Sequence, residues 1–323
     1  MPLDHYVSQV HLKQFVSPRL GDRFHAIRKR DLFYFEPNAK SVCRIEGGST
    51  NYYLSEERAI EEFLSAIEPK YNVALQNLYD NSIDRESIYV VAGFAAYVLT
   101  CSPAAMRHQS TAVQHTVEAT AKMLDAKGLL PRAPKELGSK TMSELIEGGQ
   151  INVEIDPKYP QAIGVTTVLQ LTHAFGNGNW EILINPNSDS PFFTSDFPVA
   201  TVRVDSGISI RLIPLSPTVA VSIYPKITTL SDTLDFSFKD HRNRTRRLSR
   251  REAIEINRML VRAAESEVYY CDPQPWIPGF VKKNATYRTE VIANRIPHGS
   301  GTIIHTRTEV RPYHAPTKPQ PST

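Results

Sequence analysis

Apolar and polar residues alternate in short runs at the start of the chain, and this alternation is the pattern of strands with one buried face. In the first run, apolar side chains fall on one side, while His5, Gln9 and His11 fall on the other. Aromatic and β-branched runs follow, with a Pro-Asn turn signal between them. We predict a small N-terminal sheet or hairpin with strands at 5–15, 32–35 and 41–45.

Helical spacing replaces the alternation from Ser55 onward. Ser55 is a good N-cap residue, acids follow it, and apolar residues recur three and four positions apart as far as Pro69. The run at 84–100 is apolar nearly all round, which predicts a central, buried helix. Further helices are expected at 71–79, 104–127, part of 131–149, and 162–175.

The pattern changes to short strands after the Gly-Asn-Gly-Asn turn at 176–179. Five punctuated runs predict a mainly antiparallel sheet, and a capping box from Ser249 to Glu252 opens a last amphipathic helix. The expected elements are strands at 180–184, 192–194, 200–204, 208–213, 218–223 and 268–270, and a helix at 249–267.

Together these elements predict an α+β fold, with N-terminal short strands, a central helical layer, and a C-terminal mainly antiparallel sheet with a final packed helix. We expect one domain over 1–310, helical at about 55–175 and sheet-rich at about 176–275. The proline-rich residues 311–323 lack apolar runs, so we expect a disordered tail there.

Composition excludes several classes of protein. The net charge of +3 is too small to indicate nucleic-acid binding by itself. The cysteines, Cys43, Cys101 and Cys271, are odd in number and lack metal-ligand spacing, which argues against a disulfide framework and a zinc ribbon. The N-terminus lacks a signal-peptide pattern, and no run of about 18 apolar residues occurs. We therefore expect a cytoplasmic protein without a membrane segment.

The segment 192–199 places Ser195 and Asp196 among aromatic residues and closes with Pro198 and a valine. A carboxylate in apolar surroundings has to be hydrogen-bonded, paired or used in chemistry, because an unpaired buried charge is costly. Asp196 is therefore the first candidate for catalysis, and Ser195 is a candidate substrate contact. The alternative is an Asx turn, in which the carboxylate only accepts backbone N–H groups.

His5 and Gln9 are candidates for proton transfer, because they can donate, accept and, for histidine, exchange protons near neutral pH. His11 is expected on the solvent face of an edge strand. On the first long helix, Glu61 lies beside the apolar stripe, and with Asp196 it could hold Mg²⁺ or Mn²⁺. No spacing is specific to a metal, and a solvated acidic flank is the alternative.

Asn257 lies within the apolar face of the last helix, so its amide is expected to be buried. A buried amide needs hydrogen-bond partners. These are either backbone groups of the sheet or groups in a pocket around Asp196, and the pattern leaves both open.

The densest positive charge in the chain stands just before this helix. Arginines near a helix N-terminus oppose the helix dipole, so a bound phosphate polyanion would relieve their repulsion. We therefore expect a substrate-binding surface for RNA or DNA, the alternative being a solvated basic loop that binds nothing. Its arginines are Arg242, Arg244, Arg246, Arg247, Arg250 and Arg251.

Four motifs follow one another in a recognisable order. They are His5-Tyr6-Val7-Ser8-Gln9, Thr194-Ser195-Asp196 before Pro198, Pro214-Leu215-Ser216-Pro217, and Asn257 in the last helix. In this order they resemble the bacterial and fungal domain-of-unknown-function 4238 family, from His5 to about Tyr270. The chain departs from the usual family pattern at Ser8, Phe197 and Cys101, where proline, asparagine and arginine are common.

The resemblance implies an anti-phage defence protein, either a toxic effector or a sensor. Our leading hypothesis is a cytoplasmic effector whose pocket cleaves a phosphodiester or related bond in nucleic acid. The alternatives are a non-catalytic module that recognises a phage protein or nucleic acid, and an enzyme for a small metabolite. No glycine-rich phosphate loop, nucleophile elbow or zinc-protease helix occurs in the sequence, so nucleotide hydrolysis by a standard motif is not expected. The pocket is expected to contain His5, Gln9, Glu61, Asp196 and Asn257.

Overall fold

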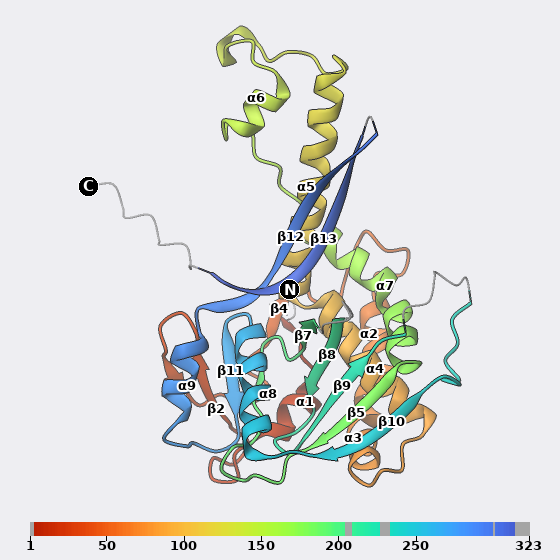
Figure 1. Ribbon diagram of the computed structural model, residues 1–323, viewed down its shortest axis with the longest axis vertical. Helices are drawn as coiled ribbons and strands as arrows, with labels where there is room; N and C mark the ends of the chain where they lie inside the picture. The colour runs from red at the N-terminus through yellow and green to blue at the C-terminus, as the bar shows by residue number, and fades with distance from the viewer. Residues whose placement is uncertain (1–2, 204–208, 227–232, 300, 314–323) are drawn as a thin grey trace.

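A computed structural model describes residues 3–203, 209–226, 233–299 and 301–313 (Figure 1). Its helices are α1 Gln9–Leu12, α2 Ala59–Ile67, α3 Tyr71–Tyr79, α4 Arg85–Cys101, α5 Pro103–Ala126, α6 Met142–Glu147, α7 Lys158–Gly176, α8 Arg250–Ala263 and α9 Ile277–Asn284. Its strands are β1 Leu3–His5, β2 His25–Arg28, β3 Tyr34–Phe35, β4 Arg44–Glu46, β5 Asn179–Ile184, β6 Thr194–Ser195, β7 Ala200–Arg203, β8 Ser209–Pro214, β9 Val219–Tyr224, β10 Arg242–Arg247, β11 Glu267–Tyr270, β12 Tyr287–His298 and β13 Gly301–Pro312. The α+β class is confirmed.

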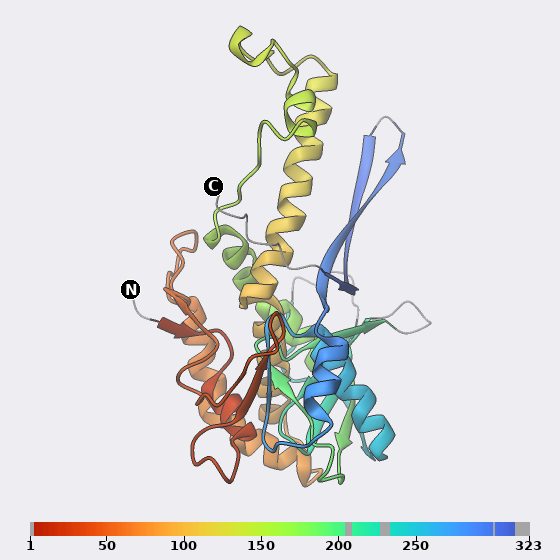
Figure 2. The same cartoon turned by 90° about the vertical axis from the view of Figure 1, so that its left-hand side faces the viewer.

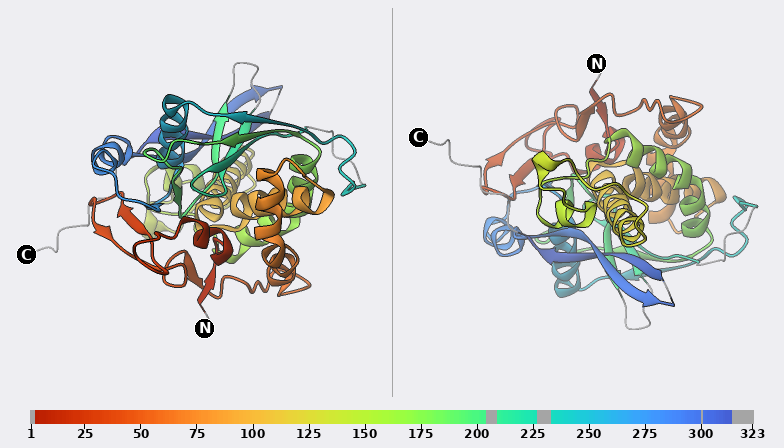
Figure 3. Two further views of the ribbon diagram at one scale, coloured as in Figure 1. Left: turned by 90° about the horizontal axis from the view of Figure 1, so that it is seen from below. Right: turned by 90° about the horizontal axis from the view of Figure 1, so that it is seen from above.

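The larger sheet, in the order β10-β5-β9-β8-β7, is covered by helices on both faces (Figure 3). Side chains alternate along β5, so that Trp180 and Ile182 pack in the cluster that contains α4. Leu183 points to the other face and packs in the cluster that contains Ala253 and Leu260 of α8. The sheet is antiparallel except for β10, which runs parallel to β5.

The smaller sheet joins distant parts of the chain in the order β3-β2-β11-β6. Its central strand, β11, pairs with β2 near the N-terminus and with β6, which ends just before Asp196. The N-terminal strands were expected to pair among themselves. Two such pairs form, β1 with β4 and β2 with β3. They do not join into one N-terminal sheet, because the other edge of β2 pairs with β11.

Helix α4 is buried on nearly every side, as its composition predicts. Asp84 caps its N-terminus by accepting a hydrogen bond from the Ser87 N–H at 2.7 Å. Helix α7 packs closely against it at Gly164, where a Cβ atom would overlap the carbonyl oxygen of Thr100. A glycine is therefore required at this crossing.

The expected strand 5–15 is wrong. Only β1 is extended, and α1 with a short 3₁₀ turn follows, held by the His11 and Leu12 N–H groups that donate to the Ser8 carbonyl at 3.1 and 3.2 Å. The fully buried residues of this segment recur at helical spacing, since Leu12 and Phe15 lie three residues apart. His11 is also fully buried, not solvent-facing.

Several predicted boundaries are corrected. Helix α2 begins at Ala59 and not at Ser55, and α8 ends at Ala263 and not at 267. The capping box of α8 is confirmed, with Ser249 and Glu252 bonded to each other's backbone. The basic segment before α8, for which a solvated loop was the alternative reading, forms β10.

A long hairpin, β12–β13, rises beside α5 from the same end of the molecule (Figures 1 and 2). It was not predicted, and it includes Arg311 and Pro312 of the expected tail. Residues 314–323 of that tail lie outside the described residues. Within the described part of the chain, no single helix is long and apolar enough to cross a membrane, whereas α4 and α5 would meet those criteria as a pair bent by 52°.

Gly164→Ala should lower the free energy of unfolding by about 1–3 kcal/mol, because the new methyl group forces α4 and α7 apart. Gly279→Ala is the matched control, since a Cβ atom there meets nothing within 4 Å. The control should be neutral or stabilising by up to about 1 kcal/mol. Urea unfolding of both variants checks this, and equal stabilities would contradict the close crossing.

Candidate functional site

A pocket of about 600 Å³ opens where β1, α1 and α2 meet, and we call it the N-terminal pocket. Three residues predicted for catalysis, His5, Gln9 and Glu61, line it together. Asp196 and Asn257 lie elsewhere. The other polar residues of its wall are Asp4, Ser49, Thr50, Arg58, Ser65 and Glu68.

The geometry around His5 selects one tautomer. Its Nε2 lies 3.0 Å from the carbonyl oxygen of Ala39, so Nε2 carries the proton and donates it to that oxygen. The Gln9 amide donates to Nδ1 across 3.4 Å, which is a weak hydrogen bond. Partial burial lowers the pKa of His5 below 6.5, so the ring is neutral at pH 7 and Nδ1 can accept a proton.

The carboxylates of the N-terminal pocket have different partners. Asp4 accepts the Ser49 N–H at 2.9 Å, and Glu61 accepts two hydrogen bonds from Arg58. Glu68 lies close enough to His5 to raise its pKa in opposition to burial. Throughout the described residues, no group of three His, Cys, Asp or Glu side chains could hold a metal ion. Glu61 lines the pocket and Asp196 does not, so the two acids considered together for Mg²⁺ or Mn²⁺ do not share this site.

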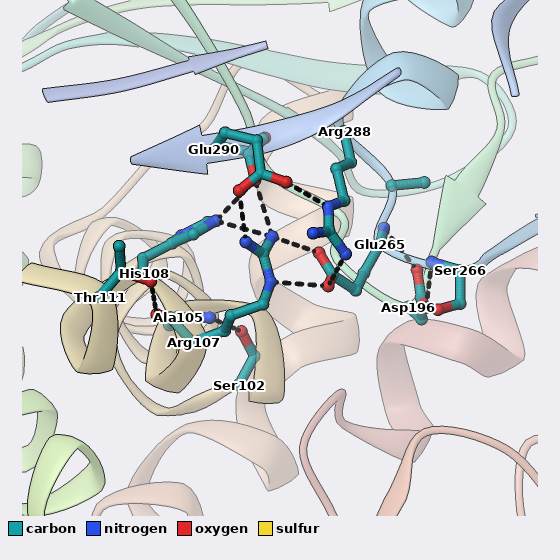
Figure 4. A network of polar contacts seen from close by, with 12 residues as sticks. Ser102, Ala105, Arg107, His108, Thr111, Asp196, Glu265, Ser266, Arg288 and Glu290 are labelled. Carbon is teal, nitrogen blue, oxygen red and sulfur yellow. Dashed lines mark hydrogen bonds and ion pairs between the residues drawn. The ribbon is translucent and has the colours of Figure 1, made fainter. Parts of the chain in front are cut away.

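Asp196 lies just after β6 and is only 6% exposed. Its Oδ1 accepts the Glu265 N–H at 3.0 Å, and its Oδ2 accepts the Ser266 N–H at 2.7 Å (Figure 4). Its own N–H donates to the Glu267 carbonyl at 3.2 Å. The carboxylate therefore satisfies the turn between α8 and β11.

Lys29 donates hydrogen bonds to carbonyl groups of the same turn, whereas Asp196 accepts from its N–H groups. Its Nζ donates to the carbonyl oxygens of Ala264 at 2.5 Å and Tyr287 at 2.6 Å, and its backbone N–H donates to Ser266. Lys29 is 3% exposed. We call Asp196, Lys29 and the turn 264–267 the polar junction.

Burial shifts both ionisable groups of the polar junction toward their neutral forms. It raises the pKa of Asp196 to about 7, and the nearby Glu267 adds to the shift. It lowers the pKa of Lys29 to about 8, although Asp196 acts in the opposite direction. Such shifts are enriched in functional sites, but here both side chains are bonded to backbone groups.

Ser195 and Asn257 also bond to the backbone. The Ser195 hydroxyl accepts the Phe197 N–H at 3.1 Å. The Asn257 side chain accepts the Phe193 N–H at 2.9 Å and donates to the Pro191 carbonyl at 2.7 Å. Asn257 is fully buried, as predicted, and these contacts hold the segment before and after β6 in place.

The six arginines before and within α8 divide into two sets. One set is paired with acids: Arg244 and Arg246 with Glu181 at 2.9 and 3.2 Å, and Arg250 with Asp189 at 2.7 Å. The other set is exposed and has no acidic partner among the described residues: Arg242, Arg247 and Arg251. Since β10 is an edge strand, its charge also discourages further strand pairing.

A salt-bridge network that no sequence pattern indicated adjoins the polar junction (Figure 4). Arg107 of α5 donates to both carboxylate oxygens of Glu265 at 2.9 Å and to Glu290 at 2.7 Å. Arg288 lies 3.5 Å from Glu265. The partners stand more than 150 positions from Arg107, so no local spacing could have revealed them.

His11 belongs to a second buried set of hydrogen-bonded side chains. Its Nε2 lies 2.7 Å from the Thr194 hydroxyl, its Nδ1 lies 2.8 Å from the Tyr71 hydroxyl, and its ring stacks on Phe94. Burial lowers the pKa of His11 to about 3, so the ring stays neutral. This residue connects α1, α3 and β6, and its role is structural.

Fold and sites together define an α+β protein with an open polar pocket beside its first strand and a separate, buried polar junction. The chain belongs to the family described as "Protein of unknown function (DUF4238)", whose profile matches residues 4–274. No curated protein and no solved structure matches the chain.

Asp196→Asn should lower the free energy of unfolding at pH 4 by about 1–3 kcal/mol, because one backbone N–H loses its acceptor. The difference should shrink as pH rises from about 4 to 7. Across this window the unfolded carboxyl is ionised, whereas burial keeps the folded Asp196 protonated up to about pH 7, so only the parent loses stability.

Urea unfolding followed by tryptophan fluorescence at several pH values measures this difference. Asp189→Asn is the control, because Asp189 is exposed and its hydrogen bond with Arg250 lowers its pKa, so its difference should stay constant from pH 4 to 7. A difference for Asp196→Asn that stays constant from pH 4 to 7, as in the control, would show that Asp196 is ionised throughout.

Proposed function

We propose that this chain is an anti-phage defence effector of the cytoplasm that hydrolyses nucleic acid in the N-terminal pocket. The observation that carries the proposal is the neutral His5, held by Ala39 and Gln9 in an open pocket with two glutamates. A histidine in this state can act as a general base near neutral pH. The pocket also lies within the residues that match the family.

RNA is the expected substrate. We expect the nucleophile to be generated by proton transfer to His5 Nδ1, which accepts only a weak hydrogen bond from Gln9. The 2′-hydroxyl of RNA provides such a nucleophile, since its proton can pass to His5 Nδ1 while its oxygen attacks the adjacent phosphorus. The bond from phosphorus to the 5′ oxygen then breaks, this oxygen takes a proton from water, and a 2′,3′-cyclic phosphate is left on the other fragment. DNA lacks this hydroxyl and would need an activated water instead.

Charge decides how the substrate is held. Asp4, Glu61 and Glu68 repel phosphate, and Arg58 is already paired with Glu61. The attraction for a polyanion must therefore come from arginines outside the pocket. Arg242, Arg247 and Arg251 are suited to this role because they are exposed and have no acidic partner among the described residues.

A second candidate is a non-catalytic module that recognises nucleic acid or a phage component. It is favoured by the backbone contacts of Asp196, Ser195 and Asn257, which assign structural partners to residues that were candidates for a site. In this case the exposed arginines would carry function and the N-terminal pocket would not.

His5→Ala should reduce RNA cleavage by about 10²- to 10⁴-fold, because the general base is lost. Purified protein is incubated with single-stranded RNA and DNA in EDTA, and again with Mg²⁺ or Mn²⁺. The control is His115→Ala, a partly exposed histidine on α5 outside the pocket. Cleavage of RNA in EDTA, lost only in His5→Ala, is expected.

The same variants are tested in bacteria challenged with phage. Protection by the parent chain and by His115→Ala, but not by His5→Ala, is expected. Full protection by a folded His5→Ala protein would contradict a catalytic role and favour the recognition module.

Replacing Arg242, Arg247 and Arg251 by alanine should weaken RNA binding and lower the slope of log affinity against log salt by about 2–3. The control replaces three arginines that are exposed elsewhere, Arg19, Arg30 and Arg132, and so changes the net charge equally. Fluorescence anisotropy at several salt concentrations measures both. Equal losses in the two triple variants would show that net charge alone attracts RNA.

A further inference from the structure

A second cavity, of about 780 Å³, lies between α5, the strands β7 and β8, and the long β12–β13 hairpin. We call it the hairpin cavity. It shares no lining residue with the N-terminal pocket. One of its walls is formed by the hairpin, which lies beyond the residues that match the family, so the cavity is not explained by the family's shared region.

Four residues of the cavity wall carry buried polar atoms that have no hydrogen-bond partner among the described residues, and one of these atoms, Arg307 Nε, lies 2.6 Å from a Glu309 oxygen in an ion pair. The other three atoms are the Gln109 side-chain oxygen, Arg211 Nε and the Thr289 hydroxyl. Buried polar groups in folded proteins are almost always paired, because an unmade hydrogen bond is costly. Three such atoms beside one cavity mark a wall whose hydrogen bonds the described residues leave incomplete.

Arg211 determines the charge of that ligand. It lies on β8, between β7 and β9, and its Nη1 donates only to the backbone carbonyls of Ser209 at 3.1 Å and Ile210 at 3.4 Å. No acid pairs with it among the described residues. Removing a guanidinium from water without a counter-charge is unfavourable, and burial lowers the pKa of Arg211 to about 10.

The other charged residues of the wall leave this positive charge uncompensated. Glu309 is within ion-pair distance of Arg307 at 2.6 Å and Arg311 at 3.1 Å. His108 lies 2.9 Å from the Thr289 carbonyl, and burial lowers its pKa, so it adds no counter-charge. The ionised lining residues are four arginines and one glutamate: Arg203, Arg211, Arg262, Arg307 and Glu309.

Apolar side chains form much of the remaining wall. They come from α7, the segment after β6, α8 and the hairpin, and they include Leu171, Phe175, Phe197, Met259 and Val291. A cavity of this size, with apolar walls and a few converging polar groups, is typical of a small-molecule site.

We propose that the hairpin cavity binds an amphipathic organic anion. Its carboxylate or phosphate group contacts the guanidinium of Arg211, and its apolar body packs against the apolar wall. Arginine suits both kinds of acidic group, because its planar donors match either in geometry. The site is independent of hydrolysis in the N-terminal pocket.

Binding is measured with the full-length chain and the fluorescent anion anilinonaphthalene sulfonate, which is then displaced by matched competitors. Octanoate and octyl phosphate carry the two acidic groups on one apolar body, octanol lacks the charge, and inorganic phosphate lacks the body. We expect displacement by octanoate, octyl phosphate or both, and the preferred one identifies the acidic group. Octanol or phosphate displacing the probe as strongly as the amphipathic anions would overturn the proposal, as would failure of the probe to bind.

Arg211→Met retains most of the side-chain volume and removes the charge, so it should weaken binding of the preferred anion by roughly 10- to 100-fold. Arg19→Met, at an exposed position outside the cavity, should bind like the parent. Thermal unfolding without ligand should show no loss of stability in Arg211→Met, because its guanidinium has no acidic partner among the described residues. Unchanged affinity in a folded Arg211→Met protein would rule out the assigned contact.

Discussion

The turn between α8 and β11 has to be buried with its backbone polar groups satisfied, and the rest of the structure is arranged around that requirement. Asp196 accepts two of its N–H groups, and Lys29 takes two of its carbonyl oxygens. Buried backbone groups without partners are rarely tolerated. Because one side chain comes from the end of β6 and the other from the end of β2, this requirement holds both strands against β11.

Helix α5 and the β12–β13 hairpin are held near the same turn by contacts of Glu265 and Lys29. Glu265 pairs with Arg107, which brings α5 against the junction, and Arg107 also reaches Glu290 of the hairpin. Lys29 donates to the carbonyl of Tyr287, where the hairpin begins. Contacts at the polar junction thus position the hairpin, which forms one wall of the hairpin cavity, although the hairpin lies beyond the residues that match the family.

The polar junction also supports the N-terminal pocket, through the residue that follows His5. Tyr6 bonds to Cys43, whose thiol lies 3.4 Å from the Tyr269 hydroxyl, and that hydroxyl donates to Glu267 at 2.8 Å. Side chains that follow one another in extended backbone point to opposite sides. His5 therefore lines the pocket while Tyr6 is anchored toward the junction, so Asp196 influences the pocket without lining it.

Local signals predicted the helices well, whereas contacts between distant segments could not be read from the sequence. The capping residues Asp84 and Ser249 and the buried amide of Asn257 follow from short-range patterns. His11 was misplaced because a few residues fit a strand and a helical turn equally well until the partners Thr194 and Tyr71 are known. Asp196 bonds to the turn at 265–266 because β6 pairs with β11, and the spacing of residues along the sequence does not predict which strands pair.

The departures from the family pattern can be understood in the same physical terms. Ser8 stands where proline is common, at φ −56°, which is close to the angle that a proline ring imposes. Its hydroxyl is buried without a partner among the described residues, so serine adds an unsatisfied group where proline would add none. Cys101 replaces an arginine at a position that is 2% exposed, and a thiol needs no counter-charge there. The first change leaves a hydroxyl unsatisfied, and the second places a neutral thiol where the family resemblance implies a charge.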